Sequence, residues 1–394
     1  MTHRYRLYPD AGQVPMLARH CSDARFVWNL ALEQAKCWRP GRAPSPGSTE
    51  RFRQLAEARR CFDWLRAGSS SVQQQALRDF DQALRNWWAG THRRPRWRKK
   101  VGDEGFCVRD VKVRRLNRRW ATIVVPKLGQ VRFRLSRSLP AAYGMARVTA
   151  DRAGRWHVSF AAPQPVMERE PTGRDVGIDA GVVATLTTSD GTQVHTPGLS
   201  AGEAQRLRRL QRRLAGQAKG SNRRAATKVA IARLKAREAD RRKDLVEKAT
   251  TGLVRDFDLI AIENLPVKRM LASAKGTIER PGINVAAKRG LNRSISAQGW
   301  SMFRRRLRDK AATFAVSVIA VDPAYTSQRC AACGHTAADN RKSQAVFVCQ
   351  SCGHEANADV NAANNILAAG LAVTARGGTS QQGPDEARTQ PVAA

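Results

Sequence analysis

The chain has 394 residues, of which 69 are Lys or Arg and 33 are Asp or Glu, a formal net charge of +36. Hydrophobic residues make up 42%, which supports packed cores in two or three domains and excludes wholesale disorder. Such an excess of positive charge repels itself in a compact fold, so we expect a polyanionic partner, nucleic acid. We find no run of 18 apolar residues and no signal-peptide core, and therefore expect a cytoplasmic protein with no membrane partner.

The first ninety residues predict one strand and three helices. Residues 4–8 alternate like a short strand, and helical periodicity follows over residues 13–37, 49–65 and 70–88. Ser70 or Ser71 is the expected cap of the third helix. A loop rich in Pro, Gly and Ser, residues 40–46, separates the first two helices.

Period-two patterns then predict a small β domain. Alternating segments lie at residues 111–114, 121–125, 131–135 and 156–160, a spacing typical of a small antiparallel barrel or sandwich. We expect residues 4–8 to complete this sheet, which makes the three helices an insertion. Residues 163–171 are the expected linker.

The second half mixes strands and helices. Buried strands are expected within residues 175–188, 258–263 and 316–322, and helices over residues 298–314 and 356–371. A very basic helical region covers residues 204–254, with a break at residues 219–222. These patterns predict an α+β multidomain protein with a terminal tail.

Four cysteines predict a structural zinc ribbon. Cys330 and Cys333 form one Cys-x2-Cys pair, Cys349 and Cys352 form a second, and fifteen residues separate the pairs. Four thiolates leave no open position on the ion, so a structural role is expected. The Gly-His that follows each pair, including His335 and His354, suits a tight turn better than ligation.

Three acids stand among apolar or small residues. Asp179 and Glu263 follow apolar runs, and Asp359 precedes a small-residue helix. Taken singly, Asp179 has an ordinary interpretation as a turn acid and Asp359 as a helix-start acid. Glu263 is a sharper signal, because an unpaired charge at the end of an apolar strand is costly. If the three converge, their mutual repulsion requires a cation. Two Mg²⁺ or Mn²⁺ ions about 3.5–4 Å apart would then catalyse phosphodiester hydrolysis.

These motifs together resemble a known family. Gly177-Ile178-Asp179, Ile262-Glu263-Asn264-Leu265 and the stretch 359–366, with the cysteine pairs before the last, are similar to TnpB, the transposon-encoded ancestor of type V CRISPR effectors. The resemblance extends to about residue 371. It implies that Asp179, Glu263 and Asp359 are the RuvC catalytic metal ligands, and that the four cysteines hold zinc. One departure is Glu263-Asn264, where the family often has Glu-Asp.

The resemblance also implies an architecture with defined bounds. A β-barrel wedge domain, residues 1–10 and 105–165, carries a helical recognition insertion over residues 11–104. An RNase H-like (RuvC) α/β domain follows over residues 172–325 and 356–371. The zinc ribbon takes residues 326–355, and residues 372–394 form a disordered tail.

The activity implied is that of an RNA-guided, Mg²⁺-dependent DNA endonuclease. Its partners would be a guide RNA and target double-stranded DNA, with a short flanking motif recognised by a monomer. Two alternatives stay open: a small type V CRISPR effector with the same chemistry, and a guided repressor that binds without cleaving. A strand-transfer transposase is disfavoured because the sequence lacks a His-hydrophobic-His motif with a nucleophilic Tyr.

Two basic segments are candidates for contact with nucleic acid: the loop around Trp97 and the Arg-rich stretch 206–242. Trp97 is flanked by charged residues, which suits base stacking. Trp28, Trp64 and Trp87 fall on apolar stripes and are expected in the core.

Overall fold

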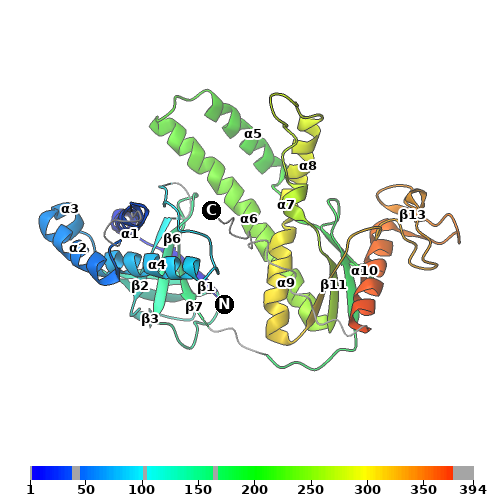
Figure 1. Cartoon of the computed structure of the whole chain (residues 1–394), viewed down its shortest axis with the longest axis horizontal. Helices are drawn as coiled ribbons and strands as arrows, with labels where there is room; N and C mark the ends of the chain where they lie inside the picture. Colours follow the sequence, from blue (N-terminus) through cyan, green and yellow to red (C-terminus); the bar gives the residue numbers. More distant parts are fainter. Residues whose placement is uncertain (1, 38–44, 101–103, 163–166, 376–394) are drawn as a thin grey trace. The chain divides into compact units, whose positions relative to one another are not determined.

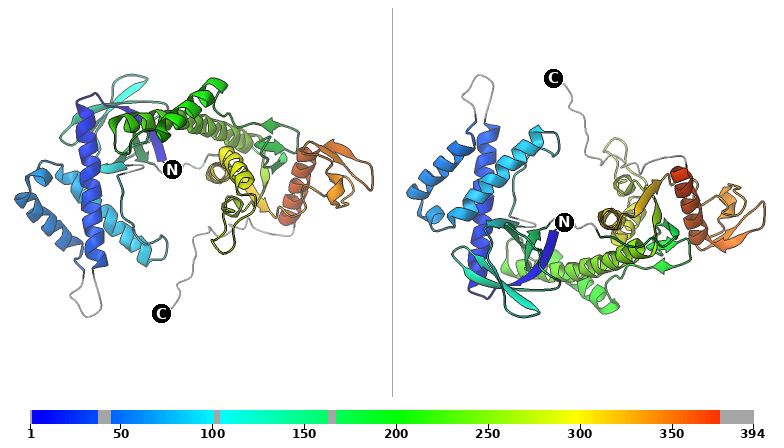
Figure 2. Two further views of the ribbon diagram at one scale, coloured as in Figure 1. Left: turned by 90° about the horizontal axis from the view of Figure 1, so that it is seen from above. Right: turned by 90° about the horizontal axis from the view of Figure 1, so that it is seen from below.

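The computed structural model describes residues 2–37, 45–100, 104–162 and 167–375 (Figures 1 and 2). These residues divide into two compact units: one holds the described residues up to 162 together with 217–233, and the other holds 167–216 and 234–375. The predicted loop 40–46, linker 163–171 and tail 372–394 fall partly outside the described residues. In the part of the chain that the structure describes, every helix is too short or too polar to span a lipid bilayer.

The first unit is built on a seven-stranded antiparallel sheet in the order β2-β6-β7-β1-β5-β4-β3. A flat sheet of this size would hold its outer strands about 29 Å apart. Only three residues, 110–112, join the outer strands β2 and β3, so the sheet must curl to bring its edges together. The strands are β1 (Thr2–Tyr8), β2 (Glu104–Arg109), β3 (Val113–Arg115), β4 (Trp120–Val125), β5 (Gly129–Arg134), β6 (Met145–Ala150) and β7 (Trp156–Ala161).

The helices of the first unit share its core. Val72, Ala76, Phe80 and Leu84 recur every four residues of one helix and are all buried, the pattern of an amphipathic helix. The cap of that helix is Ser69, whose hydroxyl accepts from the Val72 amide; the prediction of Ser70 or Ser71 was wrong. The helices are α1 (Gln13–Lys36), α2 (Ser48–Cys61), α3 (Asp63–Arg66) and α4 (Ser70–Trp88).

The expected tryptophan positions were correct in part. Trp28 is buried, and Arg98 lies over its ring at 3.7 Å. Trp64 was wrongly placed in the core: it is 46% exposed because single-turn α3 presents it to solvent, where it packs edge-on against Phe26.

The second unit contains a five-stranded sheet in the order β10-β9-β8-β11-β12. Strands β8, β11 and β12 are parallel, β9 pairs antiparallel with β8, and β10 pairs antiparallel with β9. Side chains alternate between two faces. Val176, Ile178, Ile260 and Ile262 pack on one face with Phe303 and Leu307, whereas Leu259 and Ala261 pack on the other with Ile366. The strands are β8 (Asp175–Asp179), β9 (Leu186–Thr188), β10 (Gln193–Val194), β11 (Leu259–Glu263) and β12 (Ser317–Val321).

Helices cover both faces of this sheet. In Figures 1 and 2, α9 (Trp300–Phe314) and α10 (Ala358–Ala375) lie on opposite sides of it. Helix α10 continues four residues beyond the predicted end at residue 371. The basic region forms α5 (Ala201–Ala215) and α6 (Asn222–Asp256), with the predicted break between them. The remaining elements are α7 (Val267–Met270), α8 (Val285–Gln298), η1 (Ala338–Asn340), β13 (Val346–Val348) and β14 (Glu355–Asn357).

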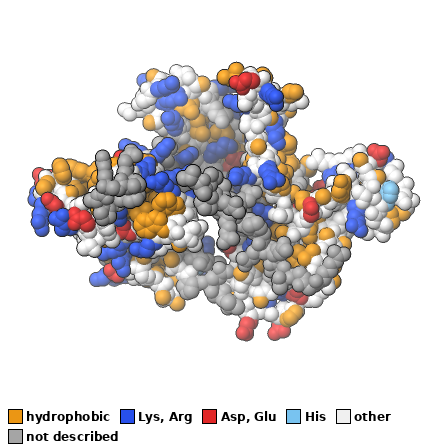
Figure 3. Space-filling view, viewed as in Figure 1, with side chains coloured by type: hydrophobic (Ala, Val, Ile, Leu, Met, Phe, Trp, Pro, Cys, Tyr) orange, Lys and Arg blue, Asp and Glu red, His pale blue; other side chains and the backbone are white. Residues whose placement is uncertain are grey.

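Basic side chains are spread over the face of the molecule that Figure 3 draws. Few Asp and Glu lie among these Lys and Arg side chains. This distribution agrees with the net charge of +36.

Candidate active site

Asp179 and Glu263 end two neighbouring parallel strands. The register of β8 and β11 sets Ile178 beside Ile262, so the next residue of each strand is one of the two acids. Ile178 and Ile262 face the core with α9, and alternation therefore turns both carboxylates toward the face that α10 covers. Neighbouring strands lie about 4.8 Å apart, so the sheet itself brings these two acids close together.

Helix α10 carries Asp359 to the same face because small residues let the helix lie directly on the sheet. A Cβ at Gly177 would stand 2.0 Å from the carbonyl oxygen of Ala363, and one at Gly370 would stand 2.6 Å from the Cβ of Ala261. A Cβ on Gly181, just after β8, would lie 3.9 Å from Oδ2 of Asp359. The first turn of α10 therefore starts beside the end of β8.

Asp359 does not cap its helix. The side-chain Oδ1 of Asn357 accepts from the amides of Asp359 (3.0 Å) and Val360 (3.2 Å), which is the capping role. The Asp359 carboxylate is thereby left for other partners.

The three predicted acids share one electrostatic environment. Burial and, after it, the negative charges of Glu263 and Asp359 together raise the pKa of Asp179 to about 7. Burial also raises the pKa of Glu263. The effect of Glu263 and Asp359 on the pKa of Asp179, and the position of Asp359 beside Gly181, indicate that the three carboxylates converge.

Arg341 is a member of this site that the sequence analysis missed. Its guanidinium donates from Nη2 to Oδ1 of Asp359 at 3.0 Å, and its charge opposes the rise in the pKa of Asp179. The carbonyls of Ser343 and Gln344 hold the guanidinium at 3.3 and 3.0 Å. No sequence signal distinguishes Arg341 among the 69 basic residues.

A buried polar network joins α10 to Glu263. Asn365 donates to the carbonyls of Thr326 (2.9 Å) and Arg329 (2.7 Å), and Asn361 donates to Arg329 (2.7 Å). The hydroxyl of Thr326 in turn donates to Oε1 of Glu263 at 2.8 Å, which opposes the rise in that carboxyl's pKa. Three asparagines, Asn361, Asn364 and Asn365, on a helix of mainly small and apolar residues were the available signal for this network.

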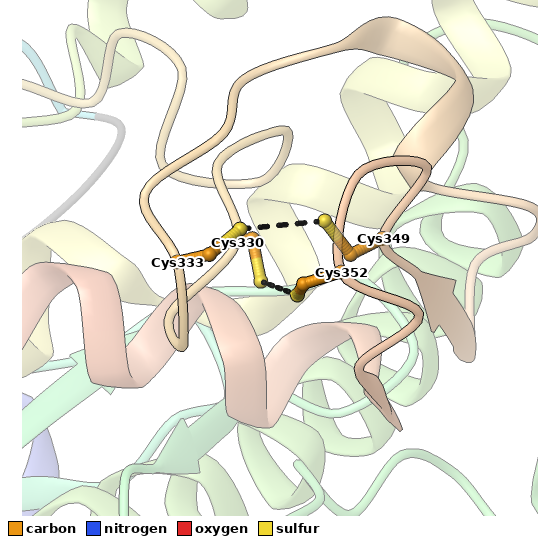
Figure 4. A group of neighbouring side chains, drawn as sticks. All are labelled: Cys330, Cys333, Cys349 and Cys352. Carbon is orange, nitrogen blue, oxygen red and sulfur yellow. Dashed lines mark hydrogen bonds between the residues drawn. The ribbon is translucent and has the colours of Figure 1, made fainter.

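The four predicted cysteines converge beside the network. Their sulfur atoms all lie within 4.8 Å of one another, and the Sγ–Sγ distances are 3.8 Å for Cys330–Cys352 and 3.6 Å for Cys333–Cys349 (Figure 4). Such a group could hold a metal ion.

The two cysteine pairs adopt the same turn. The amide of Cys330 donates to the carbonyl of His335 and that of Cys349 to the carbonyl of His354, both at 2.9 Å. Gly334 and Gly353 supply the positive φ angles, 79° and 73°, that the turns need. The backbone amides of Cys352 and Ser351 lower the pKa of Cys349 to about 6, which favours the thiolate that ligates metals. Both histidines thus contribute backbone carbonyls to turns, as predicted.

Comparison with known sequences gives three matching family descriptions. Residues 1–40 match a helix-turn-helix domain, residues 157–274 a "Probable transposase" and residues 300–366 a Cas12f1-like TNB domain. The InsQ protein of Escherichia coli (strain K12), named as an RNA-guided DNA endonuclease, is 39% identical over 96% of this chain and 94% of its own length. The TnpB-like protein L79 of Acanthamoeba polyphaga mimivirus is 31% identical over 34% of this chain and 24% of its own. The chain belongs to the TnpB family.

The TnpB fold extends to distant solved structures. Cas12f1, in a cryo-EM structure with sgRNA and target DNA, aligns with 91% of this chain and 83% of its own, at a TM-score of 0.52 and 13% identity. At such low identity the alignment shows a similarity of fold alone. Among the described residues of the segment that matches a helix-turn-helix domain, this chain forms one strand, β1, and one helix, α1.

Proposed function

We propose that this TnpB-family chain is an RNA-guided DNA endonuclease with one active site at Asp179, Glu263 and Asp359. The observation that carries the proposal is the convergence of three acids from β8, β11 and α10, where their charges raise the pKa of Asp179. The name of InsQ, at 39% identity over nearly the whole chain, supports the same activity.

The sheet order supports an RNase H-like (RuvC) domain. In chain order, β8, β9 and β10 form an antiparallel set, and β11 and β12 then lie parallel to β8 on its other side. Strand β8 is therefore the central strand. Acids at the carboxyl ends of central strands are well placed to act, since ligands of open α/β sheets bind at those ends. We propose the curled sheet of the first unit as the wedge barrel, and helices α1 to α4 as the inserted recognition domain.

The donor set of the site suits Mg²⁺ or Mn²⁺. Its ligands are oxygen atoms only, and a bound cation would lower the pKa that burial and neighbouring acids raise, so that the carboxyl ionises. When bound, two such ions would activate the attacking water and stabilise the leaving oxygen. Thr326 orients Glu263, and Arg341 balances part of the charge of Asp359.

The cysteine cluster suits Zn²⁺ in a structural role. Four thiolates match the tetrahedral preference of zinc and leave no site for water. Asn361 and Asn365 tie the segment just before and within the first cysteine pair to α10, so a filled cluster would hold that segment beside Asp359.

Replacing Asp179 tests the proposal. Asp179→Ala should abolish cleavage of a plasmid that carries the target, while the protein still binds guide RNA and target in a gel-shift assay. Asp175→Ala is the matched control, because Asp175 starts the same strand at its exposed end, and it should cleave normally. If the wild type binds guide and target but never cleaves, the chain is a guided repressor. Undiminished cleavage by Asp179→Ala would remove this site from the mechanism.

A further inference from the structure

A cavity of about 700 Å³ opens in the helical part of the first unit. Its walls come from the end of α1, the start of α2, the end of α4 and the segment after α4. This volume lies within the range of about 300–1,000 Å³ that is usual for small-molecule sites. Nothing in the proposed nuclease centre uses this cavity.

Two tryptophans form the aromatic wall. Trp87 and Trp88 end α4, with ring centroids 6.5 Å apart and planes inclined by 36°. Trp88 is 69% exposed, the largest exposed fraction of any tryptophan that the structure describes. The exposed indole of Trp88 offers a flat apolar face on which a planar ring can stack.

Positive charge surrounds these rings. The guanidinium of Arg94 lies 5.2 Å from the centroid of Trp87, and Lys36 and Arg85 also line the cavity. Among the described residues of the lining the one acid is Asp81, which pairs with Arg51 at 2.6 Å and accepts from the hydroxyl of Ser48. The cavity is therefore left with uncompensated cations beside flat aromatic surface.

We propose that this cavity binds one unstacked nucleotide of single-stranded nucleic acid, its base against Trp88 and its phosphate near Arg85 and Arg94. Flat rings offer stacking to any base, and guanidinium groups recognise phosphate. A base paired in a duplex cannot reach such a wall, so the nucleotide comes from an unpaired segment. This proposal rests on the proposed function only in taking nucleic acid as the partner. The nucleotide has two possible sources, the guide RNA and a displaced DNA strand.

Oligonucleotide binding by the full-length, RNA-free protein tests the site. The probes are a fluorescent single-stranded oligouridylate and an abasic oligomer of the same length, measured by anisotropy without divalent ions. Trp88→Ala should weaken oligouridylate binding roughly tenfold, the size expected for one lost base–aromatic stack, and leave the abasic oligomer unaffected. Trp88→Phe should restore most of the affinity. Trp64→Ala, which removes an exposed tryptophan outside the cavity, should bind like the wild type.

Equal losses for both oligomers, an equal loss in Trp64→Ala, or no loss in Trp88→Ala would overturn the proposal. Photo-crosslinking of the wild-type complex provides a test that needs no variant: guide RNA with 4-thiouridine, or target DNA with 4-thiothymidine, should cross-link to the peptide that contains Trp88. Cross-linking through one of the two strands identifies the source, and none through either refutes the site. Because these measurements need no cleavage, they stand or fall separately from the Asp179→Ala experiment.

Discussion

Single residues around the three acids have separable roles, and Thr326 offers the sharpest test among them. Its buried hydroxyl donates to Oε1 of Glu263 at 2.8 Å and so orients a proposed metal ligand. Thr326→Val keeps the shape and removes the hydroxyl. We expect the Mg²⁺ concentration for half-maximal cleavage to rise roughly tenfold, the lower end of what loss of a ligand-orienting partner usually costs.

The matched variant is Thr326→Ser, which keeps the hydroxyl and loses only a methyl group. It should cleave at nearly the wild-type Mg²⁺ concentration. Cleavage rates measured across a Mg²⁺ titration decide the matter: if Val and Ser variants show the same requirement, the hydrogen bond to Glu263 does not matter for ion binding.

The site's residues differ in how far the sequence could predict them. Asp179 and Glu263 follow apolar strands, and the period of two fixes their common face once the strands are parallel neighbours. Arg341 could not be found in this way, because eighteen positions separate it from Asp359 and the segment between them has only two short strands, β13 and β14. Arg341 comes to lie beside the start of α10 only when the segment that holds the four cysteines has folded.

Among the elements, the seam between β8 and α10 determines where Asp359 lies. Gly177→Ala would put a Cβ 2.0 Å from the Ala363 carbonyl oxygen, a backbone atom that cannot move aside alone. We expect a loss of about 1–3 kcal/mol in the free energy of unfolding, as for other overpacked cores. The cleavage rate should fall strongly even where the protein stays folded, because α10 must shift and carry Asp359 with it.

Gly198→Ala is the control for this seam, since a Cβ there meets nothing within 4 Å and the backbone φ is ordinary. Its unfolding midpoint and cleavage rate should match those of the wild type. Chemical denaturation and plasmid cleavage, run on the same preparations, give both readouts. A fully active Gly177→Ala variant would contradict the role given to the seam.

Most elements with one buried face were predicted, although β6, with its alternating exposed and buried residues, was not. The alternating strands β4, β5 and β7 and the amphipathic α4 were found from periodicity. Strand β2 was missed because three successive residues are buried: Phe106 packs on His20 of α1, and Cys107 lies beside Asp79 of α4. Helix α8 buries only Ile295 among its fourteen residues, so it has no apolar stripe to detect.

At the scale of the whole molecule, the net charge of +36 makes binding of nucleic acid depend on salt. Each neutralised phosphate releases counterions, so the logarithm of affinity should fall linearly with the logarithm of salt concentration. Between 50 and 200 mM salt we expect a loss of about 1,000-fold or more, the result of six or more phosphate contacts. Anisotropy of labelled guide RNA across a salt series measures the slope.

Arginines of α5 and α6 differ in whether they are free to bind phosphate. Arg209 is exposed and forms no ion pair within the described part of the chain, whereas Arg241 of α6 is paired with Glu203 at 2.7 Å. Arg209→Gln should therefore flatten the salt slope by about 0.7 to 0.9, the share of one phosphate. Arg241→Gln removes the same charge, but that charge is already paired with Glu203. The salt slope of this variant should therefore stay at the wild-type value. Equal slopes for the two variants would mean that only the total charge acts and that the α5 surface makes no particular contact with nucleic acid.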